Sequence, residues 1–111
     1  MIQTFLTLIA GHFVADFPLQ SDAIATGKNR NLDPAKFGVP WFYWLISHAA
    51  THALMTGFIL QNVYAGMIEF VCHFIIDLCK CEKIFGIHID QILHIICKVF
   101  LVSLVYITGK A

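Results

Sequence analysis

The stretch from Glu69 to Asp77, EFVCHFIID, decides the fold that we expect for this chain. It places Glu69, His73 and Asp77 four residues apart within an otherwise apolar run. Residues four apart lie one above the other on one face of a helix, so the stretch predicts a helix with a polar ridge. Ionisable side chains of an apolar helix cost free energy where they face lipid, and they normally face the interior of a bundle. The ridge is therefore expected to face other helices.

The same four-residue spacing recurs in other apolar segments of the chain. It relates four pairs of imidazole and carboxylate groups, namely His12/Asp16, His48/His52, His73/Asp77 and Asp90/His94. Five of the six histidines and three of the five aspartates belong to these pairs, so we expect the pairs to build one common site. The polar ridges also extend, since Gln20 follows Asp16 by four residues and Lys98 follows His94 by four.

The composition is that of an integral membrane protein. Of the 111 residues, 59% are hydrophobic and 13% are charged, and the mean hydropathy is +0.76. This charged fraction is about half of what a soluble domain carries. The formal net charge of zero gives no basic field and excludes nucleic acid as an expected partner. We expect one integral membrane domain over residues 1–111 in a lipid bilayer.

An all-α fold, a four-transmembrane-helix bundle, accommodates the apolar segments, because about 17–25 apolar residues are needed to cross a bilayer. A polar loop, in which a short helix is possible, is expected over residues 21–39. The first segment lacks a basic start and carries His12 and Asp16, so we interpret it as a retained helix rather than a signal peptide. The four expected spans cover residues 2–19, 40–61, 64–80 and 88–107.

Basic residues predict the orientation of this bundle. Lys28, Arg30 and Lys36 lie in the loop 21–39, Lys83 lies in the loop 81–87, and Lys80 directly precedes that loop. The excess of basic residues in cytoplasmic loops places both loops in the cytoplasm and the chain in the inner membrane as a multi-pass protein. At about 1.5 Å per helical residue, all four pairs then lie on the order of 10 Å below the same membrane surface.

Side chains of this kind predict a buried metal centre. Imidazole and carboxylate groups suit divalent zinc best, and iron or manganese as alternatives. Eight candidate ligands exceed the need of one ion, so the set holds two ions, or some members orient the others. The competing interpretation is that the pairs only form hydrogen bonds that hold the helices together.

Further residues have expected roles around such a centre. Glu69 is a candidate general base, and the roles of metal ligand and of hydrogen-bond partner between helices are equal alternatives for it. Lys80 and Lys98 are candidate catalytic groups that could hold a phosphate. Gln20, Gln91 and Arg30 are candidates for orienting a substrate or a metal ligand. The four cysteines match no zinc or redox spacing, and we expect unpaired thiols.

The motifs together resemble a known family. The sequence contains H-x-x-A-D-F-x-L-Q from His12, H-x3-H from His48, H-x3-D-x2-K from His73 and D-Q-x2-H from Asp90. These resemble a family of small membrane proteins of bacteria and phages whose function is unknown. They are more distantly similar to membrane-bound metal-dependent hydrolases. The second resemblance alone implies hydrolysis.

The function expected from these observations is metal-dependent hydrolysis of a lipid or another amphipathic (phospho)ester near the cytoplasmic leaflet. One alternative is transport or sensing of a divalent metal. Another is a metal-stapled small membrane protein that acts through a partner. A bundle of this size has little core of its own, so we also expect a homo-oligomer or a partner membrane protein.

Overall fold

A computed structural model describes residues 1–32 and 38–109, and this part of the chain contains helices and no strand. The all-α expectation is therefore confirmed for the described residues. Lys36, which entered the orientation argument, lies outside them. The helices are α1 (Ile2–Asp16), α2 (Asp22–Gly27), α3 (Trp41–Leu60), α4 (Val63–Cys81) and α5 (Ile87–Ile107).

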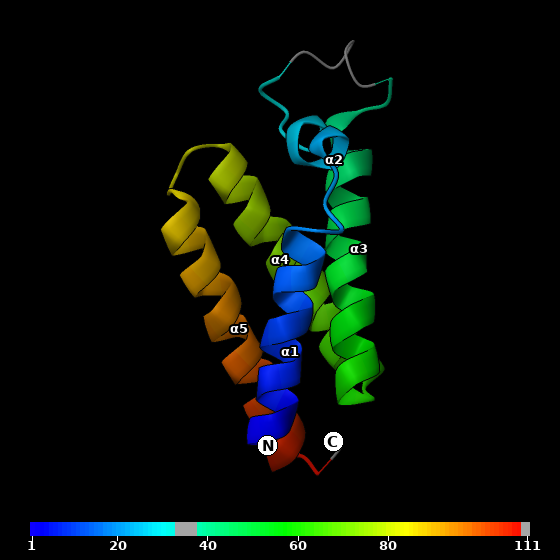
Figure 1. Ribbon diagram of the computed structural model, residues 1–111, viewed down its shortest axis with the longest axis vertical. Helices are drawn as coiled ribbons and strands as arrows, with labels where there is room; N and C mark the ends of the chain where they lie inside the picture. The colour runs from blue at the N-terminus through cyan, green and yellow to red at the C-terminus, as the bar shows by residue number, and fades with distance from the viewer. Residues whose placement is uncertain (33–37, 110–111) are drawn as a thin grey trace.

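The four longer helices run along the long axis of an elongated bundle that measures 47 × 23 × 21 Å (Figure 1). Both chain termini and the turn between α3 and α4 lie at one end, which we call the termini end. The short helix α2 and the connection between α4 and α5 lie at the opposite end, which we call the α2 end. The short helix was an expectation for the polar loop, and it occupies residues Asp22–Gly27.

The first helix ends at Asp16, three residues before the end that we expected at residue 19. Pro18 explains this difference, because proline lacks the backbone N–H that would continue the helical hydrogen bonds after Phe17. The other long helices begin and end within one residue of the expected positions. At the start of α4, Asn62 caps the helix by accepting hydrogen bonds from the backbone N–H groups of Tyr64 and Ala65.

Glycines allow α3 and α4 to pack closely. A Cβ atom on Gly66 would lie 2.9 Å from the backbone oxygen of Ala53 and 3.3 Å from the Cα of Gly57. Real Cβ atoms do not occupy so short a distance, so the two helices meet here only because position 66 has no side chain. This contact fixes the pair of helices that carries three of the five clustered histidines.

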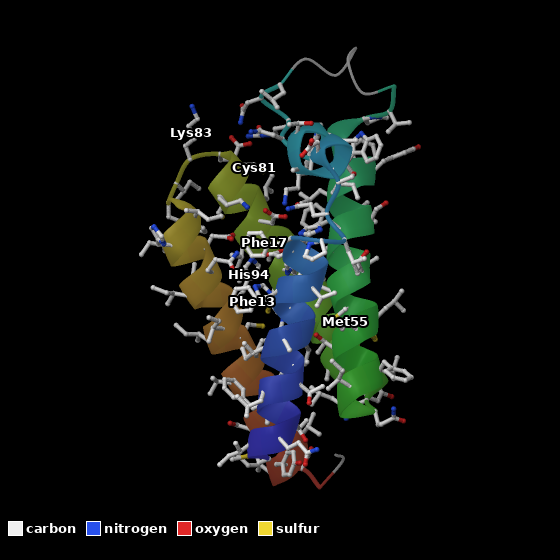
Figure 2. All side chains as sticks on the ribbon, viewed as in Figure 1. Phe13, Phe17, Met55, Cys81, Lys83 and His94 are labelled. Atoms are coloured by element: carbon white, nitrogen blue, oxygen red, sulfur yellow. The ribbon has the colours of Figure 1, made fainter. Side chains whose placement is uncertain are left out.

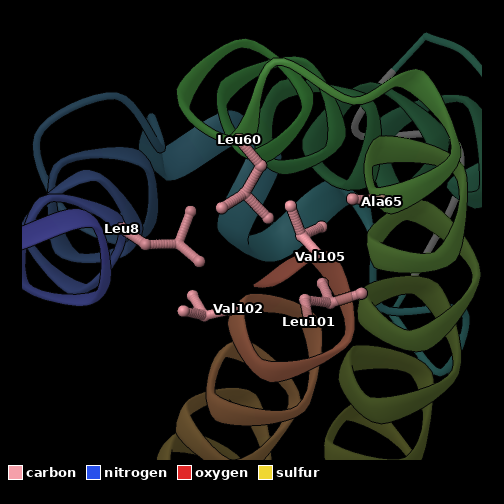
Figure 3. Close-up of a cluster of buried hydrophobic side chains, with 6 residues drawn as sticks. All are labelled: Leu8, Leu60, Ala65, Leu101, Val102 and Val105. Atoms are coloured by element: carbon pink, nitrogen blue, oxygen red, sulfur yellow. The ribbon is translucent and has the colours of Figure 1, made fainter. Parts of the chain in front are cut away.

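The interior of the bundle differs between its two ends. At the termini end the interior is a cluster of apolar side chains from the four long helices, shown in Figure 3 and made of Leu8, Leu60, Ala65, Leu101, Val102 and Val105. Toward the α2 end the buried side chains are mainly histidine, aspartate, glutamate and lysine. The exposed surface is rich in large apolar side chains, such as Leu54 and Phe58. The protein thus has a polar interior over part of its length and an apolar exterior.

One helix of the described chain, α5, is long and apolar enough to span a membrane. Helix α1 is apolar but has only 15 residues. Helix α4 carries Glu69, Asp77 and Lys80, which lower its apolar content. The finding that stands on length and composition is therefore a single candidate span.

Candidate metal centre

Five imidazole rings from all four long helices meet in the interior of the bundle. None of the five residues is more than 2% exposed. The ring of His73 is at the centre, with ring-centroid distances of 3.7 Å to His52, 4.2 Å to His94, 5.0 Å to His48 and 6.4 Å to His12. His94 is labelled in Figure 2, about midway along the bundle. The five histidines of the four expected pairs therefore lie together in one cluster.

Asp16 joins helix α1 to the two histidines of α3. Its Oδ1 lies 3.1 Å from Nε2 of His48 and 3.0 Å from Nε2 of His52. Its Oδ2 accepts a hydrogen bond of 2.8 Å from the side-chain amide of Gln91. Helix α1 ends at Asp16, two residues before Pro18, so this carboxylate extends from the last turn of the helix.

Asp16, His48, His52 and His73 form the first donor set, and their ligand atoms all lie within 4.8 Å of one another. In tetrahedral zinc sites with bonds of roughly 2.0 Å, ligand atoms lie about 3.3 Å apart. The distances from Asp16 Oδ1 to the two Nε2 atoms of α3 are close to that spacing. Three imidazoles and a carboxylate are also the donor types that zinc and related divalent ions take. This set therefore fits a divalent metal ion.

Glu69, His73 and His94 form the second donor set, again within 4.8 Å of one another. Nδ1 of His73 lies 3.5 Å from Oε1 of Glu69. Lys98 forms an ion pair with the same carboxylate oxygen. His73 is thus shared by the two sets.

Several buried polar atoms of the cluster have no hydrogen-bond partner within the described part of the chain. Both ring nitrogens of His73 and Nδ1 of His94 are among them, as are one oxygen each of Asp77 and Asp90. Leaving a buried polar group without a partner costs about 1–3 kcal/mol. Asp77 and Asp90 have ion-pair contacts instead, with Lys80 and His94. The imidazole nitrogens without a partner fit a site that binds a cation.

Asp77 lies at the α2 end of the cluster, between two lysines. Nζ of Lys28 donates hydrogen bonds of 2.6 Å to Oδ2 of Asp77 and 2.6 Å to the side-chain oxygen of Gln20. Nζ of Lys80 lies 3.4 Å from Oδ1 of Asp77 and 3.8 Å from Oδ2 of Asp90. Asp77 therefore neutralises lysines in this structure and belongs to neither donor set.

His12 and Asp90 surround the donor sets rather than belonging to them. Nε2 of His12 lies 3.0 Å from the side-chain oxygen of Gln91 and 3.5 Å from Oδ2 of Asp16. Oδ1 of Asp90 lies 3.3 Å from Nε2 of His94, and its Oδ2 accepts a hydrogen bond of 3.1 Å from Gln91. Contacts of this kind fix the ring orientation and tautomer of a ligating histidine.

Arg30 is the one expected site residue that lies away from this cluster. Its guanidinium donates to Glu82, near Cys81 and the α4–α5 connection, and its side chain is 53% exposed. This hydrogen bond holds the pKa of Glu82 below its ordinary value. The pair links the loop after α2 to the end of α4 on the surface of the protein.

Lys28 is the residue of the cluster whose position sequence reasoning missed. It is only 2% exposed, although it lies in a polar segment with Gly27, Asn29 and Arg30. No periodicity in that segment marks it as buried.

The four cysteines are free thiols, and Cys97 donates a long 3.7 Å hydrogen bond from Sγ to Glu69.

The fold and the site together define an all-helical protein with an apolar exterior and buried side chains that could hold a metal ion. The chain belongs to the family described as "Protein of unknown function (DUF3307)", whose model matches residues 4–111. No curated protein and no solved structure matches the chain. The match spans every residue of both donor sets, and its description attaches no activity to them.

Proposed function

We propose that this chain is a membrane-embedded metal-binding protein that hydrolyses a lipid or another amphipathic (phospho)ester. The single observation that carries the proposal is the first donor set, in which side chains from α1, α3 and α4 bring four ligand atoms within 4.8 Å of one another. The burial of Asp16, His48, His52 and His73 in an apolar protein supports a resident ion over a chance surface cluster.

The proposal includes four membrane-crossing helices. The length and composition of α5 support membrane insertion, and the apolar exterior of the other helices is compatible with it. Lys28 and Arg30 lie near α2, and Lys80 and Lys83 lie near the α4–α5 connection, so four basic residues gather at the α2 end (Figures 1 and 2). By the bias of basic residues to the cytoplasm, this end faces the cytoplasm in the inner membrane.

Hydrolysis is proposed because the polar cluster extends to a partly exposed lysine, Lys80, at the α2 end. A divalent ion held by the first donor set would supply a Lewis acid, and it would lower the pKa of a water that bound to it in addition to the four protein ligands. Lys80, whose side chain is 24% exposed at the α2 end, is placed to receive an anionic group of the substrate. Glu69 is already paired with Lys98, and Asp77 is paired with Lys28. Asp90, whose Oδ1 lies 3.3 Å from Nε2 of His94, is therefore the carboxylate that is better placed to accept a proton.

Transport of the ion is less well supported than hydrolysis. A conduit needs polar groups along the whole length of the bundle, since ions cross apolar regions at high cost. The interior at the termini end is instead filled by the apolar cluster that contains Leu8, Leu101 and Val105 (Figure 3). The polar interior therefore does not extend through the whole bundle. This is compatible with a site for a substrate at one membrane surface.

Metal content tests the binding part of the proposal. Protein purified in detergent without chelator is analysed for zinc, iron and manganese, next to a His48→Ala/His52→Ala variant. His88→Ala is the matched control, because His88 is an exposed histidine outside the cluster. We expect at least one equivalent of metal in the wild type and in His88→Ala and none in the double variant. Metal-free wild type would contradict the proposal.

Turnover tests the hydrolytic part separately. Wild-type protein in mixed micelles of anionic and zwitterionic phospholipids is assayed for released head groups and fatty acids by mass spectrometry. We expect product from the wild type and from His88→Ala, and none from the double variant. A wild type that holds metal but releases no product from any ester offered would leave metal binding in place and remove hydrolysis of these lipids.

A further inference from the structure

Lys98 and Glu69 form an ion pair that is sealed inside the bundle. Lys98 belongs to α5 and Glu69 to α4, and their side chains are 1% and 0% exposed. Removing two charges from water is costly, and their attraction balances this cost only when the pair is well arranged. Burying a lysine at this position therefore costs free energy, and an ion pair that only joins two helices does not explain that cost.

The partner of Lys98 is a member of the second donor set. Glu69 lies with His73 and His94 in a group whose ligand atoms are within 4.8 Å of one another. The Glu69 oxygen that contacts Lys98 is also the one that lies 3.5 Å from Nδ1 of His73. Lys98 follows His94 by four residues, so both side chains extend from the same face of α5. The ammonium group thus binds the carboxylate that a second metal ion would use.

His73 connects this set to the first donor set. It is a member of both sets, and its Nδ1 lies 3.5 Å from Oε1 of Glu69 in the second set. The two ring nitrogens lie on different sides of the imidazole, and neither has a hydrogen-bond partner within the described residues. One ring therefore lies between two neighbouring cation positions.

We propose that the ammonium group of Lys98 occupies the second cation position of a centre that is otherwise built for two metal ions. The chain then holds one metal ion, in the set of Asp16, His48, His52 and His73, and the charge of Glu69 is neutralised internally. This inference rests on the proposed metal binding and adds the number of ions and the reason for that number.

Removal of the ammonium group alone is expected to open the second position. In a Lys98→Met variant the apolar stem keeps most of the lysine volume, while Glu69 remains buried beside His73 and His94. A buried carboxylate without a partner is strongly unfavourable. A divalent ion at this position restores the missing charge and uses the donor set that is already in place.

The test is the stoichiometry of Zn²⁺ binding, measured by titration of metal-stripped protein in detergent and by elemental analysis after desalting. We expect one tightly bound ion in the wild type and two in Lys98→Met. Lys83→Met, which removes an exposed lysine, is the matched control and should bind one. Lys98→Met/Glu69→Gln removes both partners and should return to one. Co²⁺ gives a second readout, because magnetic coupling between two adjacent Co²⁺ ions changes their electron paramagnetic resonance spectrum.

Each outcome separates this inference from the proposed function. Wild type without zinc contradicts the proposed metal binding itself. Wild type with two ions contradicts the role of Lys98 while metal binding stands, and this measurement needs no variant to fold. Wild type with one ion and a monodisperse Lys98→Met variant that also holds one ion contradicts the inference, because Glu69 is then neutralised by a proton instead.

Discussion

Nζ of Lys28 lies 2.6 Å from Oδ2 of Asp77, although 49 residues separate the two positions in the sequence. Both side chains are almost fully buried, at 3% and 2% exposed. The preceding residue, Gly27, packs against Trp44 so closely that a Cβ atom there would lie 2.6 Å from the indole ring. Helix α2 is thus held across the α2 end of the bundle by one ion pair and one aromatic contact (Figure 1).

Lys28→Met is expected to destabilise the protein by about 3 kcal/mol, because removal of one partner of a buried ion pair leaves an uncompensated charge. Lys80, at 3.4 Å from the other oxygen of Asp77, compensates only in part. The free energy of unfolding in mixed micelles measures this change. Lys83→Met, at an exposed lysine, should change it little. Equal stability of the two variants would show that α2 is not anchored through Asp77.

Asp16→Asn is expected to weaken metal binding at least about tenfold, since even residues that only orient metal ligands contribute 10–100-fold to affinity. The amide keeps the size of the carboxylate but loses the charge that faces His48 and His52. Competition with a coloured chelator measures the affinity. Asp22→Asn on the exposed face of α2 is the control. Unchanged affinity in Asp16→Asn would remove Asp16 from the first donor set.

The convergence of the polar side chains was predictable from the sequence, and their pairing was not. Four-residue spacing in apolar segments predicts inward ridges, because each ridge is costly toward lipid. That argument gives the height of His73 along its helix. It does not show that His73 is the central ring, since lateral position depends on how α4 packs against α3.

The contacts of the lysines were harder still to predict. Glu69 and Lys98 were both candidate catalytic residues, but nothing in their spacing shows that they neutralise each other across two helices. Lys28 lies in a segment without hydrophobic periodicity, so only the path of the chain after Pro18 brings it to Asp77. The end of α1 at Asp16, before the expected end at residue 19, follows from Pro18, because proline lacks the backbone N–H that continues a helix.

Gly66→Ala is expected to destabilise the protein by about 1–3 kcal/mol, the usual cost of forcing extra atoms into a packed contact. The added methyl group would lie 2.9 Å from the backbone oxygen of Ala53, and backbone cannot move aside as a flexible side chain can. The free energy of unfolding is compared with that of Gly86→Ala, where nothing lies within 4 Å of the added atom. A larger loss in Gly86→Ala than in Gly66→Ala would contradict the close approach of α3 and α4.

Glu82 is expected to titrate below the ordinary glutamate value of 4.5, because the hydrogen bond from Arg30 favours its charged form. A carboxyl group whose pKa is lowered by folding adds stability above its unfolded pKa, and that stability is lost as the pH falls through the folded pKa. The chain has only two glutamates, Glu69 and Glu82, so carbon-13 labelling of glutamate lets NMR follow each carboxyl group directly. In Arg30→Gln the pKa of Glu82 should rise toward its ordinary value. Lys83→Gln is the control, because Lys83 neighbours Glu82 but forms no ion pair with it in the described part of the chain. In this variant the pKa of Glu82 should stay low. An ordinary pKa for Glu82 in the wild type would show that the loop after α2 does not reach the α4–α5 connection.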